Sequence, residues 1–284
     1  MKRAAMVALS LALPMVLGAQ VENRWRSLDV SRQLRDSVPQ RIKVQYGAGR
    51  VDVRSTNDPL LYAMHLRYDE LRASPVHRHD PEQRTTVLGL ESRGNAFPAS
   101  SSRHEDSGEL RLELPRTIPL DLDMEFGGAQ ATLELGGLAL QSARLEFGAA
   151  EGTLAFTTSN RMHMRELEIS IGAADFTARG LANANADLIR VRGGVGSVDL
   201  DFGGTWTRDL EVSTRLAIGS LTLRVPDDVG LRVEVRRVAA GFDHAGLVKR
   251  DDGWYSSNWD TAPHKLHVRA ETVFGQIELK PSTR

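Results

Sequence analysis

Apolar side chains recur at every second position over much of this chain. Residues 120–126 read LDLDMEF, with apolar residues at the even positions and acidic residues at the odd positions. The same alternation returns at 167–171 and at 198–202. A period of two belongs to a β-strand with one buried and one solvated face. Helical periodicity is almost absent after residue 20, so the sequence predicts an all-β fold.

Bends marked by glycine interrupt these strands at regular intervals. They occur in EFGGAQATLEL, EFGAAEGTLAF, SIGAADFTARG, GGVGSVDLDFGG, AIGSLTLRV and VFGQIEL. The glycines are spaced by 21, 24, 22 and 23 residues, counted from Gly127 to Gly148, Gly172 and Gly194, and from Gly196 to Gly219. A fixed period in this range is typical of a stack of similar units.

Each unit contains a strand, a tight bend, a second strand and a longer polar turn such as TTSNRM or GLANANAD. Because a strand rises about 3.3 Å per residue, roughly 22 residues suffice for one coil of a small β-solenoid. Glycine fits the corners because it accepts positive φ and lets neighbouring backbones approach. A sandwich of β-hairpins is the alternative, although its strands usually vary more in spacing.

The β-solenoid repeat domain is predicted to comprise residues 116–284 and to end in a C-terminal cap, where a longer excursion and a closing strand break the period. Residues 28–115 are predicted to form a less regular N-terminal β module, since a terminal repeat faces solvent on one side. Here WRSLDVSRQL is either a short helix or a first strand, and LLYAMHLRYDE is a strand or a short helix. The polar stretches ASPVHRHDPEQ and GNAFPASSSRHEDSG are predicted to be exposed loops.

The first residues, MKRAAMVALSLALPMVLGAQ, have the layout of a secretory signal peptide. Lys2 and Arg3 precede an uncharged run that ends in small residues, so we expect residues 1–19 to be removed on export. A buried N-terminal helix is the alternative, but such a helix rarely lacks a polar face along its whole length. No later stretch is apolar over the roughly 20 residues that a membrane span requires.

Cysteine content and charge narrow the functional classes further. The chain has no cysteine, so it carries no disulfide and no lipid-attachment cysteine. The formal net charge of −1 becomes −3 once Lys2 and Arg3 leave with the signal peptide. This near-neutral balance argues against binding to polyanions, and we expect no nucleic-acid partner.

The repeats and the C-terminal third carry a family resemblance. The residues concerned are AIGSLTLRVPDDVGLRVEV, GWYSSNWDTAPHKLHVRAETVFGQIEL and the glycine-bend strands between Gly127 and Gly219. They resemble the C-terminal domain of LiaF-like proteins and the broader class of toast-rack, adhesin-like β-repeat domains of bacterial cell-envelope proteins. The resemblance implies a right-handed stack of short strands, generally without catalysis. Some relatives with membrane helices regulate envelope-stress signalling, whereas this sequence has a signal peptide and no such helix.

Histidines supply the first candidate for a metal site. His77, His79 and Asp80 lie close together, and on a strand His77 and His79 would share one face. His65 and His104 could add ligands, but no fixed ligand spacing connects them. We expect HRHD to belong to a solvated loop and predict no metal and no cofactor. His264 and His267 are expected at the surface.

Acidic residues at outward positions supply a second candidate. If the coils are in register, these acids could form a ladder that holds Ca²⁺: Asp121, Asp123, Glu125, Glu134, Glu146, Glu166, Glu168, Asp199 and Asp201. A polysaccharide lyase would also need a poised basic residue, for which Arg144, Arg165 and Arg190 are the candidates. A solvated face that keeps the stack soluble explains the acids more simply.

Trp254, Tyr255 and Trp259 form the densest aromatic cluster. Exposed together, they would suit contact with a sugar ring or a partner protein; the alternative is that they cover the open end of the stack. No nucleophile elbow, phosphate loop or zinc-protease motif occurs in the sequence. We therefore expect an exported, periplasmic or extracellular, non-enzymatic module that binds an unidentified protein or an envelope glycan. The alternative function is a carbohydrate-active or Ca²⁺-dependent enzyme on a β-helix.

Overall fold

The computed structural model describes residues 24–93, 108–149 and 151–282, and within them the chain is all-β apart from one short 3₁₀ helix, η2 (Leu181–Ala184). This confirms the predicted all-β class. The expected signal peptide and the stretch from residue 94 to 107 lie outside the described residues. The strands are β1 (Trp25–Gln33), β2 (Gln40–Thr56), β3 (Leu60–Asp69), β4 (Ala73–Asp80), β5 (Thr85–Ser92), β6 (Glu109–Pro115), β7 (Pro119–Glu134), β8 (Ala139–Phe147), β9 (Glu151–Ala155), β10 (Met164–Ala173), β11 (Phe176–Arg179), β12 (Ala186–Asp201), β13 (Leu210–Val225), β14 (Gly230–Phe242), β15 (Leu247–Arg250), β16 (Gly253–Ser256) and β17 (Lys265–Pro281).

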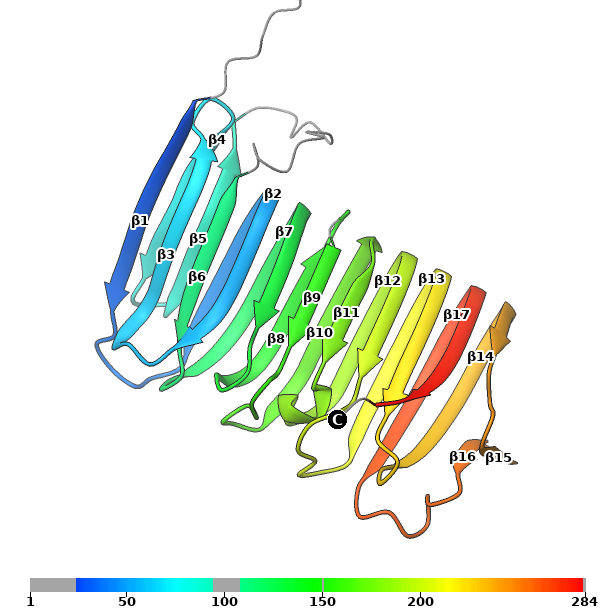
Figure 1. The fold of residues 1–284 in the computed structure, drawn as a ribbon. Helices are drawn as coiled ribbons and strands as arrows, with labels where there is room; N and C mark the ends of the chain where they lie inside the picture. Colours follow the sequence, from blue (N-terminus) through cyan, green and yellow to red (C-terminus); the bar gives the residue numbers. More distant parts are fainter. Residues whose placement is uncertain (1–23, 94–107, 150, 283–284) are drawn as a thin grey trace, which may run out of the picture.

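Between β7 and β13 the strands pair in parallel in two ladders, β7–β8–β10–β12–β13 and β7–β9–β11–β12. The chain therefore advances by one strand spacing with each repeat (Figure 1). The pairing register matches the predicted period. Phe126 lies opposite Phe147, Phe147 opposite Ile171, and Gly196 opposite Gly219. In this stretch neighbouring strands are therefore not hairpins, and the alternative of a hairpin sandwich is wrong there.

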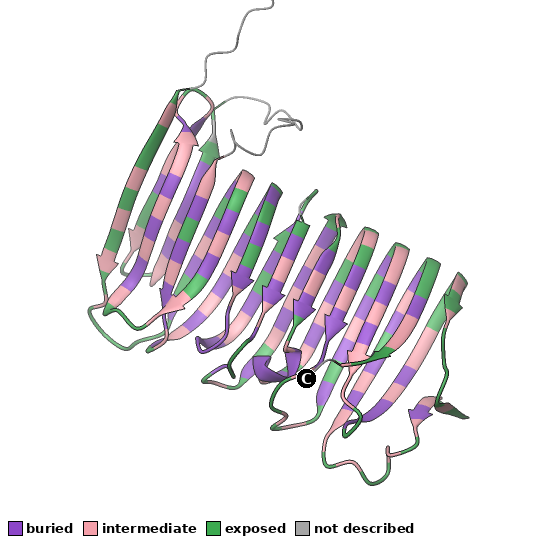
Figure 2. Ribbon diagram, viewed as in Figure 1, coloured by how far each residue is buried: buried purple, intermediate pink, exposed green. Residues whose placement is uncertain are grey.

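Each long strand bends at its glycines and contributes to two faces of the stack. In β7 the buried residues occupy even positions from Leu120 to Phe126 and odd positions from Ala129 to Leu133. Two exposed glycines, Gly127 and Gly128, separate the two runs. The change of phase turns both halves of the strand toward one core. Figure 2 shows buried residues alternating with intermediate or exposed ones along the central strands such as β7. The continuous hydrophobic cluster contains residues from Ile42 to Ile277.

At both ends of the stack the chain leaves sequence order. β2 pairs with β7, and β5 and β6 pair with the other edge of β2. At the C-terminal end β17 lies between β13 and β14 (Figure 1). β14 is thus outermost, and only Arg232 and Val233 of its outer edge pair with β16. The core cluster runs across the expected boundary between residues 115 and 116, and the division into two modules stays a prediction.

Three N-terminal segments were ambiguous or wrongly interpreted from the sequence. WRSLDVSRQL and LLYAMHLRYDE both contribute strands, β1 and β3, which pair antiparallel. The stretch ASPVHRHDPEQ is not an exposed loop over most of its length, because residues 73–80 form β4 and pair antiparallel with β5. Backbone hydrogen bonds to β5 hold this edge strand in place although its side chains lack a clear apolar alternation.

Candidate functional site

The corners of successive coils stack glycine upon glycine. A Cβ atom at Gly127, Gly148, Gly172 or Gly194 would lie 2.5, 2.9, 2.5 or 2.4 Å from the carbonyl oxygen of the corner glycine one coil earlier. These contacts are too close for any side chain, because the obstacle is backbone. Five adjoining coils, the first of them at Gly47, therefore carry no side chain at the corner.

The missing side chains leave a groove of about 840 Å³ that crosses the coils from β2 to β17. Its floor consists of the corner glycines and the buried residues next to them. Its wall is a row of outward side chains from successive strands. The floor residues include Tyr46, Phe126, Phe147, Ile171 and Leu216, and the wall residues are Gln45, Glu125, Glu146, Ser170, Arg192 and Arg215. We name this feature the corner groove.

Backbone groups of the floor are already hydrogen-bonded between coils. Gly148 donates its N–H to the carbonyl oxygen of Phe126 (2.8 Å), Ala149 to that of Gly127 (2.9 Å), and Ala173 to that of Gly148 (2.9 Å). Beneath them the rings of Phe126 and Phe147 pack with their centroids 5.4 Å apart. At these positions the floor offers van der Waals contact and no free backbone donor.

Charge divides the wall into two halves. The wall residues Glu125 and Glu146, together with Glu91 of β5, line the groove toward β5. The wall residues Arg192 and Arg215, which are opposite one another in the ladder, line it toward β17. Arg192 pairs with Glu168 at 2.5 Å and Arg215 with Glu271 at 2.8 Å. Both guanidinium-bearing side chains remain more than half exposed, at 51% and 70%.

The ion pair between Arg215 and Glu271, at the end of the groove, favours the charged form of both side chains. The hydrogen bond from Arg215, together with its positive charge, lowers the pKa of Glu271, and the hydrogen bond to Glu271 raises the pKa of Arg215. A guanidinium has five N–H donors, so each arginine keeps donors for a further anion.

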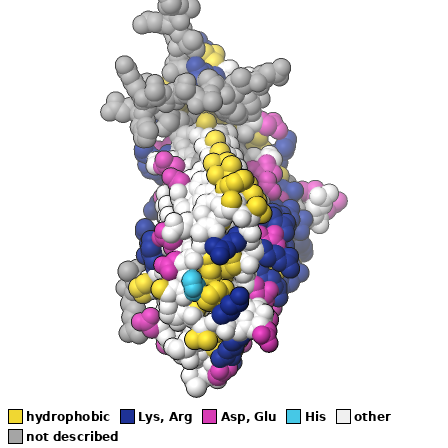
Figure 3. Space-filling model, turned by 90° about the vertical axis from the view of Figure 1, so that its right-hand side faces the viewer, with side chains coloured by type: hydrophobic (Ala, Val, Ile, Leu, Met, Phe, Trp, Pro, Cys, Tyr) yellow, Lys and Arg dark blue, Asp and Glu magenta, His cyan; other side chains and the backbone are white. Residues whose placement is uncertain are grey.

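Exposed apolar side chains continue the corner beyond the groove. Val195, Ile218 and Phe274 are opposite one another on β12, β13 and β17 and are 52, 50 and 52% exposed. Val273 at the groove end and Val238 on β14 are also exposed. Figure 3, which looks on to the side of the molecule where β14 lies, shows a band of hydrophobic side chains.

The outward acids, considered above as a candidate Ca²⁺ ladder, lie in a ladder of alternating charge. Asp123 lies between Lys43 and Arg144, and Glu168 lies between Arg144 and Arg190. Arg144 donates to Glu168 at 3.0 Å, and other acids are bound in the same way. Arg224 binds Asp199 through two nitrogens, and Arg190 pairs with Glu166. The carboxylates of Asp121 and Asp201 accept hydrogen bonds from the hydroxyl groups of Ser142 and Ser282. The carboxylate of Glu134 accepts hydrogen bonds from backbone N–H groups. Two acids do stack, because Glu125 is opposite Glu146.

The candidate metal ligands are not brought together. His65 lies 2.7 Å from Asp29, and His79 contacts the hydroxyl of Thr86 at 2.9 Å, while His77 is exposed. His104 lies outside the described residues. Within the described part of the chain no group of three or more His, Asp or Glu side chains is arranged to hold a metal ion.

The three aromatic residues of the C-terminal cap are divided between two contacts. Tyr255 is buried and stacks edge-on with Trp259, which in turn meets His267. Trp254 packs instead against Phe242 and His244, whose ring centroid is 4.2 Å away. Trp254 and Trp259 are both half-buried at the β14 end of the stack. Their contact with a glycan or a partner stays a prediction.

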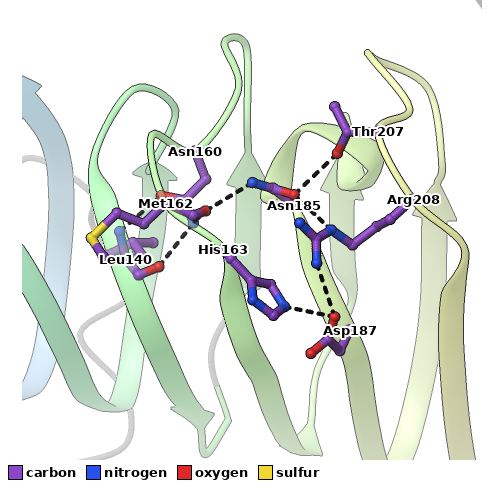
Figure 4. Close-up of polar contacts among 8 residues, drawn as sticks. All are labelled: Leu140, Asn160, Met162, His163, Asn185, Asp187, Thr207 and Arg208. Carbon is purple, nitrogen blue, oxygen red and sulfur yellow. Dashed lines mark hydrogen bonds and ion pairs between the residues drawn. The ribbon is translucent and has the colours of Figure 1, made fainter.

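The opposite edge of the stack is closed by its own polar side chains (Figure 4). Asn160 accepts from the N–H of Leu140 and donates to its carbonyl oxygen, and Asn185 donates to the carbonyl oxygen of Met162. Arg208 bridges Asn185 and Asp187. The polar side chains of successive turns thus take up one another's hydrogen-bonding groups, whereas the glycine corners leave an open groove.

A family model described as the N-terminal domain of toast_rack, DUF2154, matches residues 25–179. The chain belongs to the toast-rack family. No curated protein matches it. This result confirms the resemblance that the glycine-bend strands carry.

Solved structures are similar to this toast-rack chain at low sequence identity. One is a "putative adhesin" from Bacteroides fragilis, with 10% identity and a TM-score of 0.50 over 92% of this chain and 100% of the other. Another is a "putative cell adhesion protein" from Clostridium sporogenes, with 16% identity and a TM-score of 0.48 over 91% of this chain and 100% of the other. In the described part of this toast-rack chain, no helix is long and apolar enough to cross a bilayer.

Proposed function

We propose that this toast-rack protein is a non-enzymatic, adhesin-like binding module of the bacterial cell envelope and that it holds its ligand in the corner groove. One observation carries the proposal. The groove crosses the coils on a floor where the N–H groups of Gly148, Ala149 and Ala173 are bonded to the preceding coil, and its wall changes from acidic to basic along its length. Such a site can bind an elongated ligand and fix its direction.

The arrangement of charged side chains supports binding rather than catalysis. Glu166, Glu168 and Asp199 are paired with arginines of neighbouring coils. The wall residues of the groove form a single row with one side chain per strand. Catalysis requires several groups that converge on one reacting atom. The alternative, a carbohydrate-active or Ca²⁺-dependent enzyme, would have to use Glu125 and Glu146, the stacked pair. It predicts a turnover that Glu146→Gln abolishes.

Export, location and handedness belong to the same proposal. The first 19 residues support export to the periplasm or beyond, and family membership supports a place in the cell envelope, including an accessory role in envelope stress. The parallel stack supports a right-handed, single-stranded β-solenoid, because crossovers between parallel strands are right-handed in about 98% of cases. Mass spectrometry of the chain secreted by a bacterial host should find an N-terminus near residue 19.

Retention of the purified mature chain on isolated bacterial envelopes tests the proposal. Ser170 stands in the middle of the groove wall, so Ser170→Trp should fill the groove and weaken retention by about tenfold or more. Ser213→Trp is the matched control, because Ser213 is also half-buried on an outward strand position but does not line the groove. Equal retention of both variants, or no retention of the unaltered chain, would contradict the proposal.

A further inference from the structure

The floor of the corner groove restricts the chemistry of its occupant. An extended peptide needs partners for its own N–H and C=O groups, since unpaired backbone groups are costly when they leave water. The corner N–H groups of Gly148, Ala149 and Ala173 already bind the preceding coil. At these described positions the floor offers a peptide no free N–H donor.

A sugar chain fits the floor no better. Sugar rings bind proteins through exposed aromatic faces and dense polar contacts. The aromatic residues of the floor, Tyr46, Phe126 and Phe147, are each only 2% exposed, so their ring faces point into the core. What remains at the floor is a smooth apolar path that a flexible hydrocarbon chain can follow without needing a hydrogen bond.

The dimensions of the path suit a single long chain. The corner glycines stand on five adjoining coils, and four steps of about 4.8 Å give a glycine path of about 19 Å. The groove volume of about 840 Å³ lies within the usual range for small-molecule sites. Leu90 lines the groove on β5 at one end of the path, and Val273 on β17 lines it at the other.

The charges at the two ends fix the direction of an anionic ligand. Arg192 and Arg215 lie on neighbouring strands at one end and keep unused donors on exposed guanidinium groups. A carboxylate binds well to such planar, fixed donors. The same carboxylate would be repelled from the opposite end by Glu125 and Glu146.

We propose that the corner groove binds a long-chain fatty acid anion, with its hydrocarbon chain along the corner glycines and its carboxylate at Arg192 and Arg215. This inference rests on the proposed function, because it names the ligand class of the same groove. The ligand is a single extracted molecule and not the surface of a bilayer, since the groove has a bounded volume of about 840 Å³ and is walled by one row of side chains.

Calorimetric titration of the mature chain with oleate, below the concentration at which oleate forms micelles, tests this assignment. We expect one molecule bound per chain. Ser170→Trp should weaken binding by about tenfold or more, because the ring occupies the chain path. Ser213→Trp should bind as the unaltered chain does, and both variants should unfold at the same temperature as the unaltered chain if the fold is intact.

The head-group contact is tested separately. Arg192→Gln combined with Arg215→Gln should weaken oleate binding by about tenfold and leave the binding of oleyl alcohol unchanged, since only the carboxylate uses the two charges. Arg190→Gln is the control, because Arg190 pairs with Glu166 outside the groove. An equal loss for oleate and oleyl alcohol would overturn the assigned orientation.

Other outcomes separate this inference from the proposed function. If Ser170→Trp abolishes envelope retention but the unaltered chain does not bind oleate, the fatty acid assignment is wrong and the binding module stands. If oleate binds but the unaltered chain is not retained on envelopes, the proposed adhesive function is wrong. Binding to phosphatidylglycerol vesicles without uptake of monomeric oleate would overturn the single-chain ligand in favour of a membrane surface.

Discussion

At the scale of single residues, the hydroxyl group of Tyr46 is buried beneath the first corner. The residue is 2% exposed, and its hydroxyl has no hydrogen-bond partner within the described part of the chain. Burial raises the pKa of Tyr46, so the phenol is neutral. An unpaired buried hydroxyl is unfavourable, and Tyr46→Phe should raise the free energy of unfolding by about 1 kcal/mol. Urea denaturation measures this, and a decrease of similar size would show that the hydroxyl is paired.

His267 links stability to pH at the other end of the stack. Burial, followed by the charge of Arg232, lowers the pKa of His267 below its ordinary value. The unfolded chain, in which a histidine has a pKa of about 6.5, therefore takes up the proton first as the pH falls. The free energy of unfolding should decline as the pH falls from 6.5 through the lower pKa of the folded state.

The variant His267→Gln isolates this contribution, because it removes the titrating group and keeps a polar side chain. Urea denaturation at pH 7.5 and at pH 5.5 should show a smaller loss of stability for the variant than for the unaltered chain. His79, whose pKa burial also lowers, retains its own contribution in both proteins. Identical losses in the two proteins would show that His267 does not titrate differently on folding.

At the scale of the coil, the neighbouring corner glycines Gly127 and Gly128 differ in whether the backbone of the preceding coil leaves room for a side chain. A Cβ at Gly127 would lie 2.5 Å from the carbonyl oxygen of Gly47, whereas a Cβ at Gly128 would lie 4.0 Å from the same atom. Gly127→Ala should lower the free energy of unfolding by about 2 to 4 kcal/mol through displaced backbone. Gly128→Ala should change it by less than about 1 kcal/mol. Thermal unfolding of the pair decides the point, and equal effects would contradict corner stacking.

The sequence pattern predicted the regular coils for two reasons. Burial of one face of a strand makes apolar residues recur at every second position, and close contact between neighbouring backbones requires glycine at the corners. The pattern failed at β4, since an edge strand is held by backbone hydrogen bonds that HRHD does not disclose. It also missed the corner groove. Aligning the coils at their bends would have placed Glu125, Glu146, Arg192 and Arg215 in one row, two residues before each corner. Whether that row flanks an open groove depends on packing, which a linear pattern does not contain.

For the whole molecule, a stack in which each coil contacts only its neighbours should lose structure from its ends. At the C-terminal end the outer edge of β14 is paired only at Arg232 and Val233. Trp259 lies over this end and contacts Tyr255 and His267 at 5.2 and 4.9 Å between ring centroids. If the aromatic residues act as a cap, Trp259→Ala should speed amide hydrogen exchange in β14, β16 and the start of β17.

Exchange in β8 and β10 should stay as slow as in the unaltered chain, because β12, β13 and β17 separate these strands from β14. Hydrogen exchange followed by mass spectrometry resolves the two regions within one sample, so the central strands serve as an internal control. A uniform increase would mean that the stack unfolds as one unit. Unchanged protection of β14 would mean that Trp259 contributes little to the end of the fold and that its half-buried ring is available for the predicted contact with a glycan or a partner protein.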